Sequence, residues 1–155
     1  MAETPYGLAE TWLLNHRVNL RLLAHLTEEQ LAWATHSRAR SIADQFAHLH
    51  NARIMWLEPR APQVAGRLRK IEKGAATRAE LERALTESAE AIAAMLAEAE
   101  RTGKLKSARR GPLAFLGYAL AHEGHHRGQI ILHLKQAKMP IDSMVGFSLW
   151  EWEKL

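Results

Sequence analysis

Residues 122–133 read His122-Glu123-Gly124-His125-His126-Arg127-Gly128-Gln129-Ile130-Ile131-Leu132-His133 and hold four of the chain's nine histidines. His122 and His126 are four residues apart, so on a helix both imidazoles lie on one face, one turn apart. Two neutral imidazoles at this spacing can share one divalent metal ion, with bonds of about 2.0–2.1 Å. The same face is otherwise apolar, and imidazoles buried there without partners would cost free energy. We therefore predict a helix that carries part of a metal site rather than one lined by solvated imidazoles.

The composition is that of an ordinary globular protein. The chain has 155 residues, of which 47% are hydrophobic and 25% charged, so we expect a single domain that spans residues 1–155. It has no cysteine, which excludes disulfides, thiolate zinc ligands and a protein-borne thiol nucleophile and agrees with a reducing cytoplasm. The first residues lack the pattern of a signal peptide, and no apolar run is long enough to cross a bilayer. We therefore expect a cytoplasmic protein without a membrane partner.

The formal net charge of +4 is only a mild excess of basic residues. Its densest part, residues 101–110, also has the pattern of a loop and has no interleaved aromatic residues. Nucleic-acid binding favours a basic cluster on one face with aromatic side chains among the charges. The charge pattern therefore favours a solvated connection over a nucleic-acid partner.

Apolar residues at spacings of three and four predict helices along most of the chain. Capping-box patterns that begin at Thr27 and Thr77, and a cap at Ser41 with Asp44 three residues on, mark helix starts. The expected long helices are Tyr6–His25, Ile42–Glu58, Thr77–Thr102 and Gly111–Lys138. The second of them carries Met55 and an apolar stripe of Ile42, Phe46, Leu49 and Trp56.

Four long amphipathic segments, with no stretch of alternating polarity, predict an all-α fold, a four-helix bundle. Residues 59–74 are expected to be a partly ordered lid or crossover with a short helix, so the connections are long and simple up-down topology is not assured. Residues 141–155 form a short tail that is rich in large apolar side chains. We expect this tail to pack on the bundle or on a second subunit.

A third metal ligand is needed to complete the site, because two imidazoles alone bind a divalent ion weakly. His48 is the best candidate, since it lies in mid-helix beside an apolar stripe. Three histidines leave coordination positions open for water or substrate, which is typical of catalytic rather than structural sites. Arg127 and Gln129 are candidate helpers that orient ligands or bind an acidic substrate; the alternative is that both are ordinary surface side chains.

Residues 122–126 also match the H-E-x-x-H pattern of zinc metalloproteases, in which Glu123 would be the general base. The longer form of that motif fails, because position 129 is Gln and position 132 is Leu. No predicted strand precedes the helix to hold a peptide substrate. The five-residue pattern alone does not outweigh an all-helical chain.

At His122-x-x-x-His126-Arg127-Gly128-Gln129, together with His48 and with Trp56 eight residues beyond it, the sequence resembles the DinB-like (DinB/YfiT) family of metal-binding four-helix bundles. The resemblance covers most of the chain and includes the capped start at Ser41. It implies a metal site made of His48, His122 and His126, and commonly a homodimer. It does not include among the metal ligands Glu123, His50, His125 or His133.

Characterised members of that family include S-transferases that use a low-molecular-weight thiol such as bacillithiol or mycothiol, a thiol-dependent maleylpyruvate isomerase, and proteins described as metal-dependent hydrolases. The resemblance therefore implies a metal-dependent enzyme, a thiol-dependent S-transferase or a hydrolase, that acts on a small molecule. Its cofactors would be a divalent ion (zinc, nickel, iron or manganese) and a low-molecular-weight thiol. The alternative is a non-catalytic metal- or ligand-binding dimeric bundle, which a fourth protein ligand such as His50 or Glu123 would favour.

Overall fold

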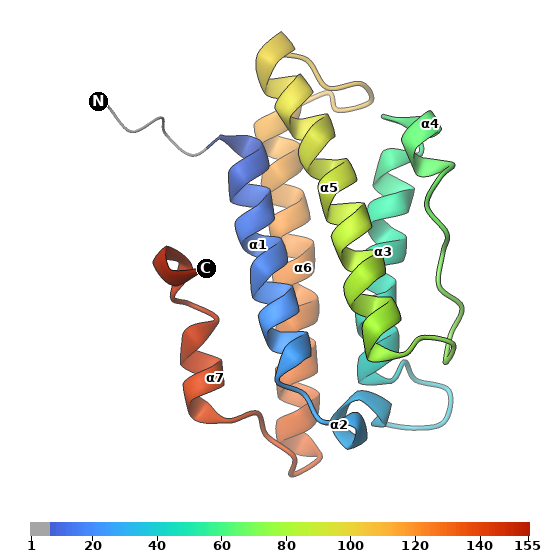
Figure 1. Cartoon of the computed structure of the whole chain (residues 1–155), viewed down its shortest axis with the longest axis vertical. Helices are drawn as coiled ribbons and strands as arrows, with labels where there is room; N and C mark the ends of the chain where they lie inside the picture. Colours follow the sequence, from blue (N-terminus) through green and yellow to red (C-terminus); the bar gives the residue numbers. More distant parts are fainter. Residues whose placement is uncertain (1–6) are drawn as a thin grey trace.

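Four long helices lie side by side in the computed structural model, which describes residues 7–155 (Figure 1). They are α1 (Leu8–Ala24), α3 (Ile42–Leu57), α5 (Arg78–Thr102) and α6 (Gly111–Gln136). Short helices complete the chain, namely α2 (Glu28–Ala32), α4 (Pro62–Ala65), α7 (Ser143–Ser148) and the 3₁₀ turn η1 (Trp152–Lys154). Residues 7–155 contain no strand, so the predicted all-α class is confirmed. The expected start of the first helix at Tyr6 lies outside the described residues.

The predicted helix starts are confirmed by complete capping boxes. In each box the first residue's side chain accepts a hydrogen bond from the fourth residue's N–H, and the fourth side chain accepts one from the first N–H; the pairs are Thr27–Gln30, Ser41–Asp44 and Thr77–Glu80. Helix α5 ends at Gly103, whose φ of 69° lies in the left-handed region that glycine adopts without strain. Helix α6 ends at Gln136 rather than Lys138, because Lys138 itself takes a φ of 60°.

Each of the four long helices contributes fully buried apolar side chains to the core. Helices α5 and α6 both pack against α1 and α3. The core includes Trp12, Leu22, Phe46, Leu85, Ile92 and Ile130. The stripe of Ile42, Phe46, Leu49 and Trp56 is buried, whereas Met55 of the same helix is 53% exposed. On α3 the buried stripe passes through Ala52 and Trp56, and Met55 lies about 100° around the helix from Trp56.

The C-terminal tail packs against the long helices through part of its apolar surface. Leu149 is buried in the core, and Trp152 and Leu155 pack against the same cluster. Arg21 of α1 donates a hydrogen bond from Nη1 to the Ser148 carbonyl at 3.3 Å. The other large side chains of the tail point outward; these are Met144, Phe147 and Trp150. The prediction that the tail packs on the helices therefore holds for only some of its side chains.

A membrane-spanning helix is absent from residues 7–155, because none of their helices is both long enough and apolar enough.

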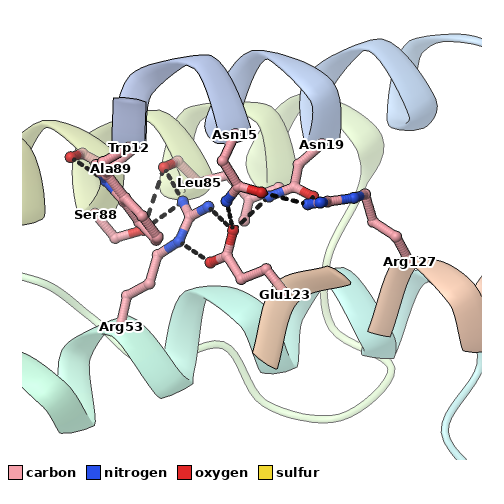
Figure 2. A network of polar contacts seen from close by, with 9 residues as sticks. All are labelled: Trp12, Asn15, Asn19, Arg53, Leu85, Ser88, Ala89, Glu123 and Arg127. Carbon is pink, nitrogen blue, oxygen red and sulfur yellow. Dashed lines mark hydrogen bonds and ion pairs between the residues drawn. The ribbon is translucent and has the colours of Figure 1, made fainter. Parts of the chain in front are cut away.

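A buried ion pair lies at the centre of the four helices (Figure 2). Arg53 of α3 donates from Nε to Glu123 Oε1 at 2.7 Å and from Nη2 to Oε2 at 3.0 Å, and both side chains are 0% exposed. The Arg53 guanidinium also donates from Nη1 to the Leu85 carbonyl of α5 at 2.7 Å, and it lies 4.9 Å from the centre of the Trp12 ring of α1. This one arginine therefore contacts all three of the other long helices.

Helix α1 closes the network around the carboxylate. Asn15 and Asn19 each donate from Nδ2 to Glu123 Oε2 at 2.6 Å, and Arg127 Nη1 donates to both asparagine Oδ1 atoms at 2.7 and 2.8 Å. Burial opposes ionisation of Glu123, but the charge and hydrogen bonds of Arg53, with the bond from Asn19, outweigh it and lower the pKa of this carboxyl. The carboxylate is thus ionised, fully buried and fully hydrogen-bonded.

Breaking one half of this ion pair should destabilise the fold far more than replacing both halves. Arg53→Met leaves a buried carboxylate without its counter-charge, and we expect it to cost about 3–5 kcal/mol of unfolding free energy. Glu123→Leu should cost a similar amount. The double variant should cost clearly less than the sum, as measured by urea unfolding in a double-mutant cycle. The exposed pair Arg101–Glu98, treated in the same way, is the control and should barely change stability. Additive losses at Arg53 and Glu123 would contradict the coupling.

His16 is a second polar group buried in the core. Its side chain is 5% exposed, and neither ring nitrogen has a hydrogen-bond partner within residues 7–155. Burial, with the nearby Arg53 charge, lowers its pKa to about 4. His16 is therefore neutral in the folded protein at pH 7.

This lowered pKa predicts that acid weakens the fold through His16. Below pH 6.5 the unfolded chain gains a proton on this imidazole while the folded chain does not, so stability falls as the pH drops from 6.5 toward 4. Between pH 7.5 and pH 5 the expected loss is about 2 kcal/mol. His16→Leu should reduce the pH dependence of the unfolding free energy by that amount, whereas the same change at the exposed His36 should not. An unchanged pH dependence in His16→Leu would contradict the assignment.

Candidate metal centre

Three histidines from two helices meet at one point beside the core. His48 of α3 and His122 and His126 of α6 each offer a ring nitrogen, and these nitrogens lie within 4.8 Å of one another. The ring centres are 5.6 Å apart for His48 and His122, and 4.6 Å apart for each of the two pairs with His126. The structure thus brings together the three residues that the sequence singled out.

Helical geometry explains this meeting. His122 and His126 are one turn apart on the same face of α6, as their spacing predicted. Helix α3 packs against this helix, and His48 lies on it one turn after Asp44. His48 and His122 are half-buried and His126 is buried, so the cluster lies at the edge of the core.

All three imidazoles are neutral at pH 7. Burial lowers the pKa of His126 to about 4, helped by the neighbouring His48 and His122. Burial also lowers the pKa of His48, with the charge of Arg40 as a second cause, and burial lowers the pKa of His122. A metal ion needs the neutral ring with a free lone pair, so the cluster is in the form that binds metal.

Gln45 orients the ring of His126. Its Oε1 lies 3.0 Å from His126 Nδ1, and both side chains are buried. An amide oxygen can only accept, so Nδ1 carries the proton and Nε2 keeps its lone pair for a ligand bond. Metal-binding histidines commonly have such a partner on the second ring nitrogen.

The donor set fits a divalent metal ion. His122 Nδ1 is buried and has no hydrogen-bond partner within residues 7–155, so the protein leaves one nitrogen of the cluster without a partner. Three imidazoles suit zinc, nickel or iron, and no carboxylate joins the group of three. Such a set leaves coordination positions open.

The other polar residues of the motif point away from the cluster. The carboxylate of Glu123 is bound by Arg53, Asn15 and Asn19, so it is held in the core rather than beside the histidines. Arg127 donates to the same two asparagines, so its guanidinium belongs to this network. With its carboxylate so occupied, Glu123 is not free to serve as the general base of an H-E-x-x-H protease.

The remaining candidates do not supply a fourth ligand. His50 is buried, and its Nε2 is 2.9 Å from the Arg69 carbonyl. His125 is exposed, and the ring of His133 faces that of Trp33 at 6.1 Å. Gln129 is half-buried, and no hydrogen bond joins it to the three histidines within the described chain.

Two residues near the cluster were missed by motif analysis. Gln45 precedes His48 by three residues, a spacing that places both on one side of α3 and was the available signal. Tyr118 precedes His122 by one turn, and their ring centres are 6.3 Å apart. Trp56, which was predicted as part of the apolar stripe and of the family pattern, also packs against His122, with ring centres 5.1 Å apart.

Comparison with known protein families agrees with this geometry. The family model described as DinB family matches residues 1–144. The chain belongs to the DinB family. Comparisons with curated proteins and with solved structures gave no match. The three histidines are therefore a candidate metal centre in a DinB-family protein, at the positions that the resemblance implied.

If Gln45 sets the ring of His126, its removal should weaken metal binding without unfolding the protein. Gln45→Met takes away the acceptor of Nδ1–H, and we expect zinc affinity, measured by competition with a chelator, to fall about 10–100-fold. Gln45→Glu keeps an acceptor and should restore the affinity to at least the wild-type value. Gln136→Met at the exposed end of α6 is the matched control. Wild-type affinity in Gln45→Met would contradict the positioning role.

Proposed function

We propose that this DinB-family protein is a metal-dependent enzyme that acts on a small molecule, as a thiol-dependent S-transferase or a hydrolase. The observation that carries the proposal is the convergence of three neutral imidazoles on one point without a fourth protein ligand. A structural metal site is normally closed by four protein ligands, whereas a catalytic site keeps a position open. The divalent ion held there would be zinc, nickel, iron or manganese.

A divalent ion in this site would lower the pKa of a coordinated thiol or water molecule. Either one would then be a better nucleophile at neutral pH. His48, His122 and His126 would hold the ion. Gln45 keeps His126 in the tautomer that binds. Trp56 and Tyr118 pack edge to face beside His122, with ring centres 5.7 Å apart, and form an aromatic wall on this side.

The chain has no cysteine, so in the transferase version the thiol arrives as a low-molecular-weight cosubstrate. No protein residue is assigned as the nucleophile or the general base. We further propose that the four long helices form the four-helix bundle of the family, that the protein is a homodimer, and that it acts in the cytoplasm. The exposed apolar side chains of the tail are compatible with a dimer.

A second candidate function is a non-catalytic, metal-binding dimer. The unpaired ring nitrogen of His122 favours metal binding over a histidine cluster that binds no metal, because a buried ring nitrogen without a partner costs free energy. The two functions differ in whether the coordination positions left by the three histidines exchange small ligands. Thiol binding to the metal-loaded protein separates them.

The proposal predicts about one metal ion per chain, lost when a ligand is removed. Mass spectrometry of tag-free protein should find the ion in the wild type and in His125→Ala, whose exposed imidazole lies next in sequence to His126. His126→Ala should hold far less, since two imidazoles bind weakly. A cobalt-substituted sample should change its visible spectrum when a low-molecular-weight thiol is added.

Three results would count against parts of this proposal. Equal metal content in His126→Ala and the wild type would show that His126 is not a metal ligand. Absence of metal from the wild type, even after reconstitution with several divalent ions, would reject the enzyme. The non-catalytic dimer would be favoured if added thiol left the visible spectrum of the metal-loaded protein unchanged and if the water bound to the metal did not exchange.

A further inference from the structure

A cationic cavity adjoins the metal centre. It has a volume of about 310 Å³ and lies where the loop before α6 meets the end of α3. Three arginines line it, namely Arg60, Arg109 and Arg110, and none of its lining residues is acidic. Phe115 and Tyr118 of α6 form an apolar wall. The cavity thus combines an aromatic wall with a positively charged rim.

Arg60 is held in place but keeps unused donors. Its guanidinium donates from Nη1 to the Trp56 carbonyl at 2.9 Å and from Nη2 to the Ser107 carbonyl at 3.1 Å, and it lies 4.7 Å from the centre of the Phe115 ring. Both acceptors are neutral, and no ion pair joins Arg60 to a carboxylate in residues 7–155. Its positive charge is therefore not balanced by a neighbouring acid.

Two buried N–H groups here lack acceptors. Arg60 Nε and Trp56 Nε1 are both inaccessible to solvent and have no hydrogen-bond partner among the described residues. Because both nitrogens are closed to solvent and Trp56 does not line the cavity, a ligand in the cavity would not reach them; it would instead meet the exposed side chains of Arg109 and Arg110. An anion offers several acceptor atoms and also balances the arginine charge.

The cavity and the histidine cluster share a wall. Tyr118 lines the cavity, and its ring centre is 6.3 Å from that of His122. Trp56 packs against Phe115 at 6.1 Å on the cavity side and against His122 at 5.1 Å on the other. A small molecule seated against these rings would therefore reach from the arginines toward the metal centre.

From this arrangement we infer that the cavity binds the anionic end of the substrate, a small organic acid with an apolar body. The carboxylate would pair with Arg109 and Arg110 and accept from Arg60, while the body lies on Phe115 and Tyr118. This inference rests on the proposed function for the reacting end of the molecule. The anion site itself depends only on the cavity and its charges.

Calorimetric titration with phenylacetate tests the inference on chelator-treated and on zinc-loaded protein. Phenylacetate carries a carboxylate on an aromatic body, and phenylacetamide is its neutral counterpart. Arg109→Ala/Arg110→Ala should weaken phenylacetate binding about tenfold or more, because two charged donors are lost. Lys104→Ala/Lys106→Ala removes the same charge from the same loop outside the cavity and should leave the affinity close to wild type.

The outcomes separate this inference from the proposed function. Selective loss in the arginine variant, with weak phenylacetamide binding and unchanged zinc content, supports the anion site. Equal losses in the two double variants, or no phenylacetate binding to the wild type, overturn it. The titration also uses chelator-treated protein, so it tests anion binding even if the protein binds no metal.

Discussion

The buried ion pair between Arg53 and Glu123 sets the rotation of α6 about its axis, and the meeting of the three histidines depends on that rotation. Successive residues on a helix point about 100° apart, so with Glu123 aimed at the centre, His122 and His126 must lie off to one side, where they meet His48. Rotation of α6 about its axis that separated the histidines would also leave the Glu123 carboxylate buried without Arg53. Replacing such a pair with apolar side chains often costs little, whereas breaking it costs several kcal/mol. We therefore interpret its role here as specifying one helix register rather than supplying net stability.

One stretch of α6 thus carries two kinds of polar residue with opposite states. Both oxygens of Glu123 accept hydrogen bonds within the protein, and Arg127 donates from Nη1 to two asparagines, so the two residues link α6 to α1 and α3. The histidines beside them are neutral, and one ring nitrogen of His122 has no partner. Groups whose hydrogen bonds are made within the protein fix the positions of the helices and have little capacity left to bind a ligand. Unsatisfied groups have that capacity, which is why the same five-residue motif contains both a structural carboxylate and candidate ligands.

Local signals in the sequence predicted the helices well, because capping residues act within a single turn. The pairs Ser41–Asp44 and Thr77–Glu80 formed as expected. Assigning faces was harder, since periodicity gives spacing on one helix but not which neighbour each face meets. Glu123 matched a protease motif, yet its partners come from α1 and α3, which no spacing in α6 could predict. The histidine pair was predictable from its four-residue spacing, and His48 from its place beside an apolar stripe. Gln45 belongs to no motif, and its role follows from a contact between α3 and α6 that the sequence does not reveal.

Charge links the metal centre to the cavity beside it. Three neutral imidazoles contribute no negative charge, so an ion bound by them would keep its full double charge and favour an anionic ligand such as a thiolate. The positive charge of Arg40 adds to this effect, since after burial it is the next cause of the lowered pKa of His48. Arg60, Arg109 and Arg110 extend the positive field along the aromatic wall. A site with carboxylate ligands would tolerate neutral substrates more readily. If the three histidines hold a metal ion, the site and the cationic cavity would both favour anionic groups, so the ligand residues and the proposed substrate class fit each other.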